Sequence, residues 1–203
     1  MILSECGEGL PNNLRVCEFV DSILTEEFLR KLIRESGYPV WEGEDNGEGL
    51  LLRTLNYQLK RVLCALDIKD GKILDLGCGA SRKNVESMMF RKGSFGMYEP
   101  WLCRTLHKLG YNVLGIDIGE QKDEKFPHVR LNLLEDKLDF IETGSVDVAN
   151  ATMLFTSPEL RRQITGEESA ENAWLAHSEK LKAILLPQLE RIVQPKGYFV
   201  YYR

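Results

Sequence analysis

The chain has 203 residues, of which 43% are hydrophobic and 28% charged, and its formal net charge is −5. These values are ordinary for one globular domain with a modest additional segment. The sequence contains no run of about 18 apolar residues, so no membrane-spanning helix is predicted. The N-terminus lacks the basic and apolar regions of a signal peptide. The negative charge disfavours generic nucleic-acid binding through a basic surface.

The cysteines and histidines indicate neither disulfides nor a metal site. An odd, dispersed set of cysteines without a CxxC pair is typical of reduced thiols, so we expect a cytoplasmic protein. The histidines lie far apart, without the spacing that metal sites require, and no bound metal is expected. The residues concerned are Cys6, Cys17, Cys64, Cys78, Cys103, His107, His128 and His177.

Residues 1–70 are predicted to form a helical cap or flanking segment. Thr25 is suited to cap a helix that ends at residues 36–37. A second helix is expected over residues 52–66, where leucines and a valine form one apolar stripe. Residues 14–20 are short and partly β-branched, and their pattern leaves strand and loop both open.

From residue 71 onward, strands are expected to alternate with helices. A helix opens at residues 99–101, and a long one covers about residues 170–193, interrupted at Pro187. This alternation predicts an α/β fold with a doubly wound parallel sheet, in the strand order 3-2-1-4-5. The five expected strands are residues 72–76, 112–117, 129–131, 145–151 and 198–202.

Three polar positions follow successive strands and indicate a nucleoside site. The run ILDLGCG (residues 73–79) is a strand that ends at a glycine turn, where backbone and ligand can approach closely. Ligands of doubly wound sheets bind at these carboxyl ends. Asp117 ends the next strand, where an acid can accept hydrogen bonds from ribose hydroxyls. Asn132 follows the third strand, and its amide is suited to pair with an adenine edge.

These segments resemble the motifs of class I, Rossmann-like S-adenosylmethionine (SAM)-dependent methyltransferases. ILDLGCG resembles the first motif of that family and VLGIDI the second, while VDVANATMLF and LERIVQPKGYFVYY resemble its fourth- and fifth-strand segments. The resemblance covers residues 71–203, which we expect to be a SAM-binding Rossmann-like domain. It implies a cofactor pocket built from Asp75, Gly77, Cys78, Gly79, Asp117, Ile118, Asn132, Leu133, Asn150 and Ala151.

The segment after the glycine turn departs from the family pattern. Ser81 stands where a third glycine is common, and Arg82 occupies the third glycine position of a nicotinamide-binding GxGxxG. No Walker lysine motif occurs, so the pattern favours SAM over NAD or a nucleoside triphosphate. Arg82 and Lys83 are candidates for binding an anion, most simply the cofactor carboxylate. A solvated charged loop is the competing interpretation.

The substrate side is less defined than the cofactor side. Methyl transfer needs a positioned nucleophile more than a protein catalyst, so no catalytic residue is assigned. The fourth strand does not end in an NPPY-like run, which weakens methylation of DNA bases and favours a small-molecule acceptor. Packing in the core or on a helix is the alternative role for the aromatic candidates. The residues considered for the acceptor wall are Tyr98, Glu99, Trp101, Trp174 and His177.

Two other functional classes stay open. The chain fits a catalytically silent SAM-binding or regulatory subunit, or another nucleotide-binding Rossmann protein such as a dehydrogenase. The sheet apparently ends after the fifth strand, which would expose its edge. We expect the N-terminal segment, with residues 14–20 as the candidate, or a partner chain, for instance a second copy, to cover that edge; a shortened substrate wall is the alternative.

Overall fold

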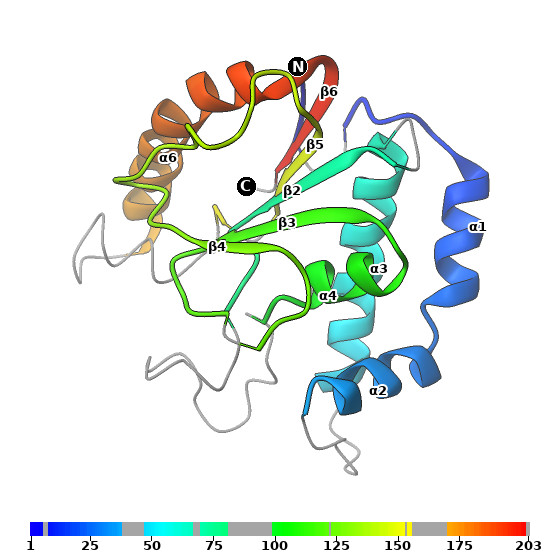
Figure 1. The fold of residues 1–203 in the computed structure, drawn as a ribbon. Helices are drawn as coiled ribbons and strands as arrows, with labels where there is room; N and C mark the ends of the chain where they lie inside the picture. The colour runs from blue at the N-terminus through cyan, green and yellow to red at the C-terminus, as the bar shows by residue number, and fades with distance from the viewer. Residues whose placement is uncertain are drawn as a thin grey trace.

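The computed structural model describes residues 1–5, 8–37, 47–66, 70–80, 99–121, 123–152, 154–155 and 170–201, with the backbone alone at residues 5, 47–48 and 170–178. These residues form an α/β structure with a six-stranded, all-parallel sheet, ordered β1-β6-β5-β2-β3-β4 (Figure 1). The strands are β1 (Ile2–Glu5), β2 (Lys72–Leu76), β3 (Asn112–Asp117), β4 (His128–Arg130), β5 (Val146–Ala151) and β6 (Val193–Tyr201).

The predicted strand order is confirmed. Strands β4-β3-β2-β5-β6 correspond to the expected order 3-2-1-4-5, with Lys72–Leu76 at the centre and not at an edge. The bounds of β2 and β3 are those expected. The strand β4 begins one residue earlier than predicted, and β6 begins five residues earlier, directly after the preceding helix. The arrangement is consistent with a Rossmann-like fold.

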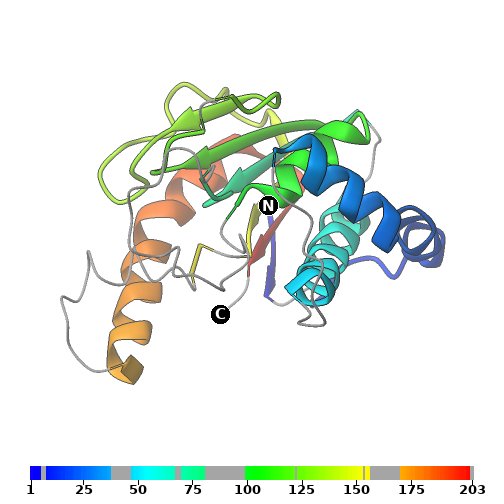
Figure 2. The same ribbon diagram turned by 90° about the horizontal axis from the view of Figure 1, so that it is seen from below.

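Helices cover both faces of the sheet (Figures 1 and 2). One face packs against α1 (Leu14–Ile23), α2 (Glu26–Glu35), α3 (Gly47–Ala65) and α4 (Trp101–Lys108), and the other against α6 (Ala170–Ile192). Side chains alternate along each strand because successive residues point to opposite faces. Ile73 therefore belongs to the core with α1–α4, whereas Leu74 belongs to the core with α6.

Residues 14–20, for which strand and loop were the open predictions, form part of helix α1. The side chain of Asn13 caps this helix by accepting a hydrogen bond from the Val16 amide at 3.2 Å. Val16, Val20 and Ile23 follow at helical spacing and pack into the core. The predicted Thr25 cap of α2 is confirmed, with the Phe28 amide as its donor.

The free edge of β6 is covered by β1, a segment that was predicted to belong to the helical N-terminal part. Ile2 pairs with Tyr198 and Glu5 with Tyr201 in parallel register. The N-terminal ammonium of Met1 donates to the carbonyl of Pro195 at 3.0 Å and fixes the start of the pairing. The expected coverage by the N-terminal segment is therefore confirmed, but by residues 2–5 and not by residues 14–20, which belong to α1 and pack against α3 on one face of the sheet.

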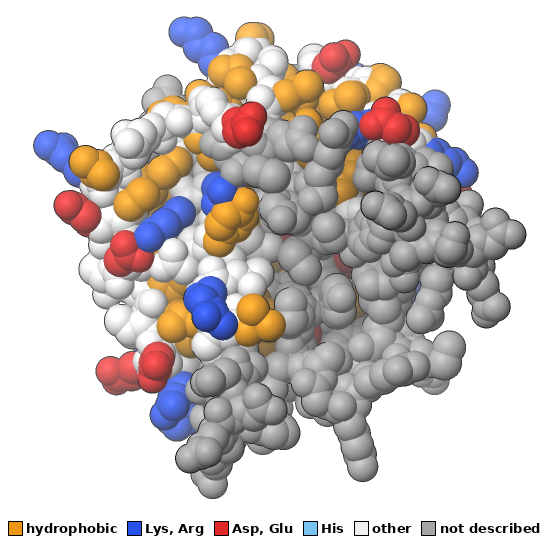
Figure 3. Space-filling model, turned by 180° about the vertical axis from the view of Figure 1, so that it is seen from behind, with side chains coloured by type: hydrophobic (Ala, Val, Ile, Leu, Met, Phe, Trp, Pro, Cys, Tyr) orange, Lys and Arg blue, Asp and Glu red, His pale blue; other side chains and the backbone are white. Residues whose placement is uncertain are grey.

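The surface of the described residues carries charges of both signs. On the face seen in Figure 3, lysine and arginine side chains are interspersed with acidic ones and with scattered apolar side chains. Within the described part of the chain, no helix combines the length and apolar character needed to cross a membrane.

Candidate ligand site at the carboxyl ends of the strands

The chain order reverses between β2 and β5. From β2 the chain proceeds outward to β3 and β4, then returns to the other side of β2 to form β5 and β6. Ligands of open α/β sheets bind at the carboxyl ends of the strands that flank such a reversal. Asp75 of β2 lies opposite Asn150 of β5 in the strand register, close to these ends. The candidate site is therefore the region beyond this pair.

The glycine turn after β2 is held against β3. Gly77 and Gly79 both adopt positive φ angles, +67° and +97°, which glycine reaches without steric cost. The amides of Gly77 and Cys78 donate to the carbonyl of Ile116 at 2.8 and 3.1 Å. A Cβ at Gly77 would lie 2.8 Å from a Leu154 methyl carbon. Glycine is thus required by conformation and by contact.

Asp117 joins this turn to the end of β3. One carboxylate oxygen accepts the Gly79 amide at 2.9 Å, and the other accepts the Gly119 amide at 2.7 Å. These two hydrogen bonds fix the Asp117 carboxylate between the glycine turn and the residues that follow β3. The expected proximity of Asp117 and the glycine turn is therefore observed.

Asp75 is a buried carboxyl group, 4% exposed, and two donors face it. The Asn150 side-chain amide donates to it at 2.6 Å, and the Cys103 thiol donates at 3.3 Å. Burial, together with the nearby charge of Asp117, raises the pKa of Asp75 to about 6, although these two hydrogen bonds lower it. A cation bound beside Asp75 would lower this pKa and favour the ionised carboxylate.

Gln121, which the sequence analysis did not single out, holds the glycine turn from the other side. Its amide nitrogen donates to the Gly79 carbonyl at 2.6 Å and lies 2.7 Å from the Cys78 sulfur. Its oxygen Oε1 is buried and has no hydrogen-bond partner among the described residues, as is true of Oδ1 of Asn150. Buried acceptors without partners are costly and are found where a ligand or water completes them.

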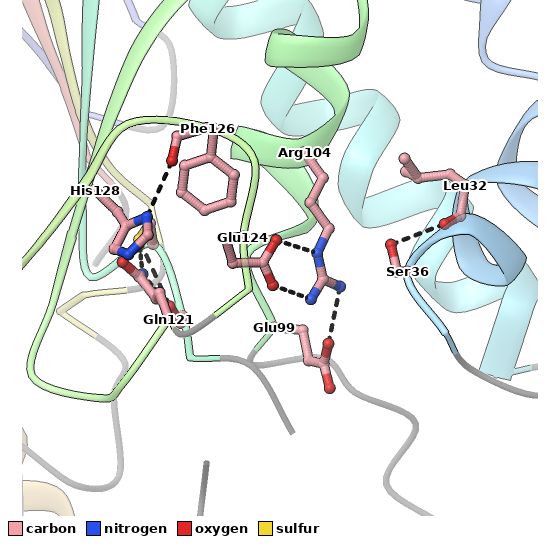
Figure 4. A network of polar contacts seen from close by, with 10 residues as sticks. Leu32, Ser36, Glu99, Arg104, Gln121, Glu124, Phe126 and His128 are labelled. Carbon is pink, nitrogen blue, oxygen red and sulfur yellow. Dashed lines mark hydrogen bonds and ion pairs between the residues drawn. The ribbon is translucent and has the colours of Figure 1, made fainter. Parts of the chain in front are cut away.

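Glu99, a candidate for the acceptor wall, belongs to a buried ion-pair cluster around Arg104 (Figure 4), and Trp101, another candidate, is buried beside Arg104. Arg104 donates to Glu99 at 2.8 Å and forms a two-point ion pair with Glu124. Its guanidinium also lies 4.5 Å from the Trp101 ring centroid. Burial lowers the pKa of Arg104, but Glu124 and Glu99 outweigh burial and raise it. For Trp101 the structure therefore favours the core alternative.

The remaining sequence candidates are spread over several environments. Ile118 is half-buried beyond β3, and Ala151 is fully buried at the end of β5. The side chain of Asn132 accepts the Leu134 amide at 3.2 Å within a turn, and Leu133 packs into the core with α6. Arg82, Lys83 and Tyr98 lie outside the described residues. Trp174 and His177 are on α6, and their side chains are outside the described part.

Neither a reactive thiol nor a metal cluster is evident in the described residues. Burial raises the pKa of the Cys78 thiol, which favours its protonated form. No group of three or more His, Cys, Asp and Glu side chains suited to hold a metal occurs in the described ranges.

Comparison of the chain with protein-family models, with curated proteins and with solved structures returned no match. The functional argument therefore rests on the motif resemblance and on the geometry at the carboxyl ends of the strands.

Proposed function

We propose that this protein is a SAM-dependent methyltransferase that acts on a small-molecule acceptor in the cytoplasm. The proposal combines the resemblance of ILDLGCG and the segments after it with the arrangement of the corresponding residues. The observation that carries it is the contact of Asp117 with the glycine turn, through its two hydrogen bonds to the Gly79 and Gly119 amides. In Rossmann-like sheets, a glycine turn lets the backbone approach a nucleotide, and an acid at the end of the next strand accepts hydrogen bonds from the ribose hydroxyls.

The residues present fit a cationic nucleoside cofactor. Asp75 and Asp117 supply negative charge at the strand ends, and the unpartnered Oε1 of Gln121 and Oδ1 of Asn150 supply further acceptors. SAM, when bound, supplies the methyl group on a sulfonium. In this proposal Asp117 accepts the ribose hydroxyls and Asp75 faces the cationic end of the cofactor. Gly77 and Gly79 leave room for the ligand, because they carry no side chain at the turn.

The protein's contribution to the reaction is then mainly orientation. A methyl group leaves a sulfonium by in-line displacement, so the acceptor must be held opposite the sulfur. Thr152 directly follows β5, and its hydroxyl accepts the Asn150 side-chain amide at 3.2 Å. No residue among those described is assigned as a general base.

Calorimetric titration tests the cofactor assignment. The purified chain is titrated in parallel with SAM, S-adenosylhomocysteine and NAD. We expect SAM and S-adenosylhomocysteine to bind and NAD not to bind. Binding of NAD alone would overturn the proposal in favour of a dehydrogenase-like protein.

A second measurement separates an enzyme from a silent SAM-binding subunit. The protein is incubated with SAM and fractions of a small-molecule extract, and S-adenosylhomocysteine release is followed. Release with one fraction identifies the acceptor class. SAM binding without release in any fraction, including fractions that contain protein or nucleic acid, would favour a regulatory subunit.

A further inference from the structure

Helix α3 carries a polar side chain within its buried apolar stripe. Gln58 is 7% exposed and lies among Leu51, Leu55, Leu59 and Val62, all of which are buried. An amide in such surroundings is costly unless its hydrogen-bonding groups find partners. The partner of Gln58 is therefore informative about why a glutamine occupies this position.

Gln58 reaches across from α3 to the carboxyl end of β5. Its amide nitrogen donates to the Thr152 hydroxyl oxygen at 3.0 Å. The same oxygen accepts the Asn150 side-chain amide at 3.2 Å, and that amide also donates to Asp75 at 2.6 Å. A continuous buried chain of hydrogen bonds thus joins the N-terminal helical segment to the carboxyl group at the centre of the candidate site.

The chain of bonds fixes the orientation of the Asn150 amide. A side-chain amide has two hydrogens, and here one faces Asp75 and the other faces Thr152. Gln58 and Asn150 both donate to the Thr152 hydroxyl oxygen, which has two acceptor positions. The reversed amide would bring its oxygen against the Asp75 carboxylate, which is repulsive when Asp75 is ionised.

We propose that Gln58 is a positioning residue of the ligand site: through Thr152 it holds the Asn150 amide against Asp75 and so sets how readily the site accepts a cationic ligand. The part that concerns the ligand rests on the proposed function, whereas the part that concerns Asp75 does not. It makes the N-terminal helical segment a component of the site, although it contributes none of the residues expected from the sequence.

The other groups around Asp75 do not duplicate this role. Asp117 approaches from β3 and raises the pKa of Asp75, while the Cys103 thiol on α4 donates to it and lowers that pKa. The Cys78 thiol lies on the same side, in the glycine turn. The described residues that donate hydrogen bonds to Asp75 are both uncharged: Asn150 on β5 and Cys103 on α4. Loss of the Gln58 contact is therefore expected to weaken the Asn150 bond and raise the pKa of Asp75.

The test compares Gln58→Leu with Gln194→Leu. Gln194 also donates from a side-chain amide, to Asp147 at 2.6 Å, but at the opposite end of β5. The Asp75 carboxyl is titrated by carbon-13 NMR in the ligand-free protein. SAM affinity is measured from about pH 5.5 to about pH 8, a range that includes the Asp75 pKa of about 6. We expect Gln58→Leu to raise the Asp75 pKa and to weaken SAM binding about threefold to tenfold near pH 6, less at pH 8. Gln194→Leu should change neither.

Thr152→Val removes the shared acceptor while keeping the shape of the side chain, and it tests the same chain of bonds from its middle. It should shift the Asp75 titration in the same direction, and the double variant with Gln58→Leu should shift it no further. An unchanged Asp75 titration in both single variants would overturn the positioning role. A shifted titration in a protein that binds no SAM would support the positioning role and overturn the proposed cofactor instead.

Discussion

The two ends of the central strands hold aspartates in similar local settings, but their surroundings differ. At the amino end, Asp147 accepts the Lys72 amide at 2.7 Å and the Gln194 side chain at 2.6 Å. At the carboxyl end, Asp117 likewise accepts two N–H groups, yet buried acceptors of Asn150 and Gln121 nearby have no partner in the described residues. The two aspartates thus have similar hydrogen bonding, but the carboxyl end combines it with the buried unpartnered acceptors of Asn150 and Gln121.

One expected difference between the ends is in ligand affinity. Asp117→Ala should weaken SAM binding by about 2–4 kcal/mol, because the ribose hydroxyls lose a charged acceptor. Asp147→Ala removes an aspartate that also accepts two N–H groups, so it controls for lost structural hydrogen bonds. Calorimetry should show wild-type affinity for Asp147→Ala at a temperature where it stays folded. Equal losses in both variants would mean that the Asp117 effect is structural.

Stability should respond in opposite directions at the two ends. Above pH 6 the buried Asp75 is ionised and destabilises the fold, because its pKa is raised from 3.8 to about 6. Asp75→Asn should therefore raise the free energy of unfolding at pH 7–8, by less than the ionisation penalty of about 3 kcal/mol, because its amide nitrogen would meet the Asn150 or the Cys103 donor. The gain should shrink as the pH falls through 6 and vanish near pH 4, where both states of the wild-type carboxyl are protonated.

Asp147→Asn is the control for this prediction. Both Asp147 oxygens accept N–H groups, so an amide nitrogen would meet a donor and cost about 1–3 kcal/mol. Urea unfolding as a function of pH measures both variants. A destabilised Asp75→Asn protein at pH 8 would contradict the assignment of Asp75 as a buried charge retained for binding.

A smaller difference is expected between two glycines of nearly equal conformation. Gly77 has φ +67° and Gly144, before β5, has φ +66°. Alanine should cost about 1–2 kcal/mol at either position, because left-handed backbone disfavours a side chain. Gly77→Ala should cost a further ~1–3 kcal/mol from contact with Leu154, whereas nothing lies within 4 Å of a Cβ at Gly144. Denaturant midpoints of the two variants measure this difference.

Much of the fold was predictable because its central strands carry strong local signals. Lys72–Leu76 and Asn112–Asp117 are apolar runs that end at glycine or at an acid, and their bounds were predicted correctly. β1 was missed because its four residues become a strand only by pairing with β6, almost the whole chain away. Helix α1 was missed because its apolar spacing extends over residues 16–23, whereas residues 14–20 alone are too few to show a helical period.

The site was predictable only in part, for a related reason. The motif residues Asp75, Gly79, Asp117 and Asn150 are brought together as the strand order requires. Gln58 and Gln121 have no motif, since a glutamine on a helix or in a loop is ordinarily a surface residue. One signal was available for Gln58: its position within the apolar stripe of α3, between Leu55 and Leu59. The binding of SAM itself stays a prediction.

The pairing of β1 with β6 sets a time order on folding. During synthesis β1 emerges before the other described strands, whereas its partner, Val193–Tyr201, emerges after all of them. Closing so long a loop costs entropy that local contacts must first offset, so this early strand is among the last to dock. Until then the β6 edge, with its row of unpaired backbone groups, is open to other chains in the folding intermediate.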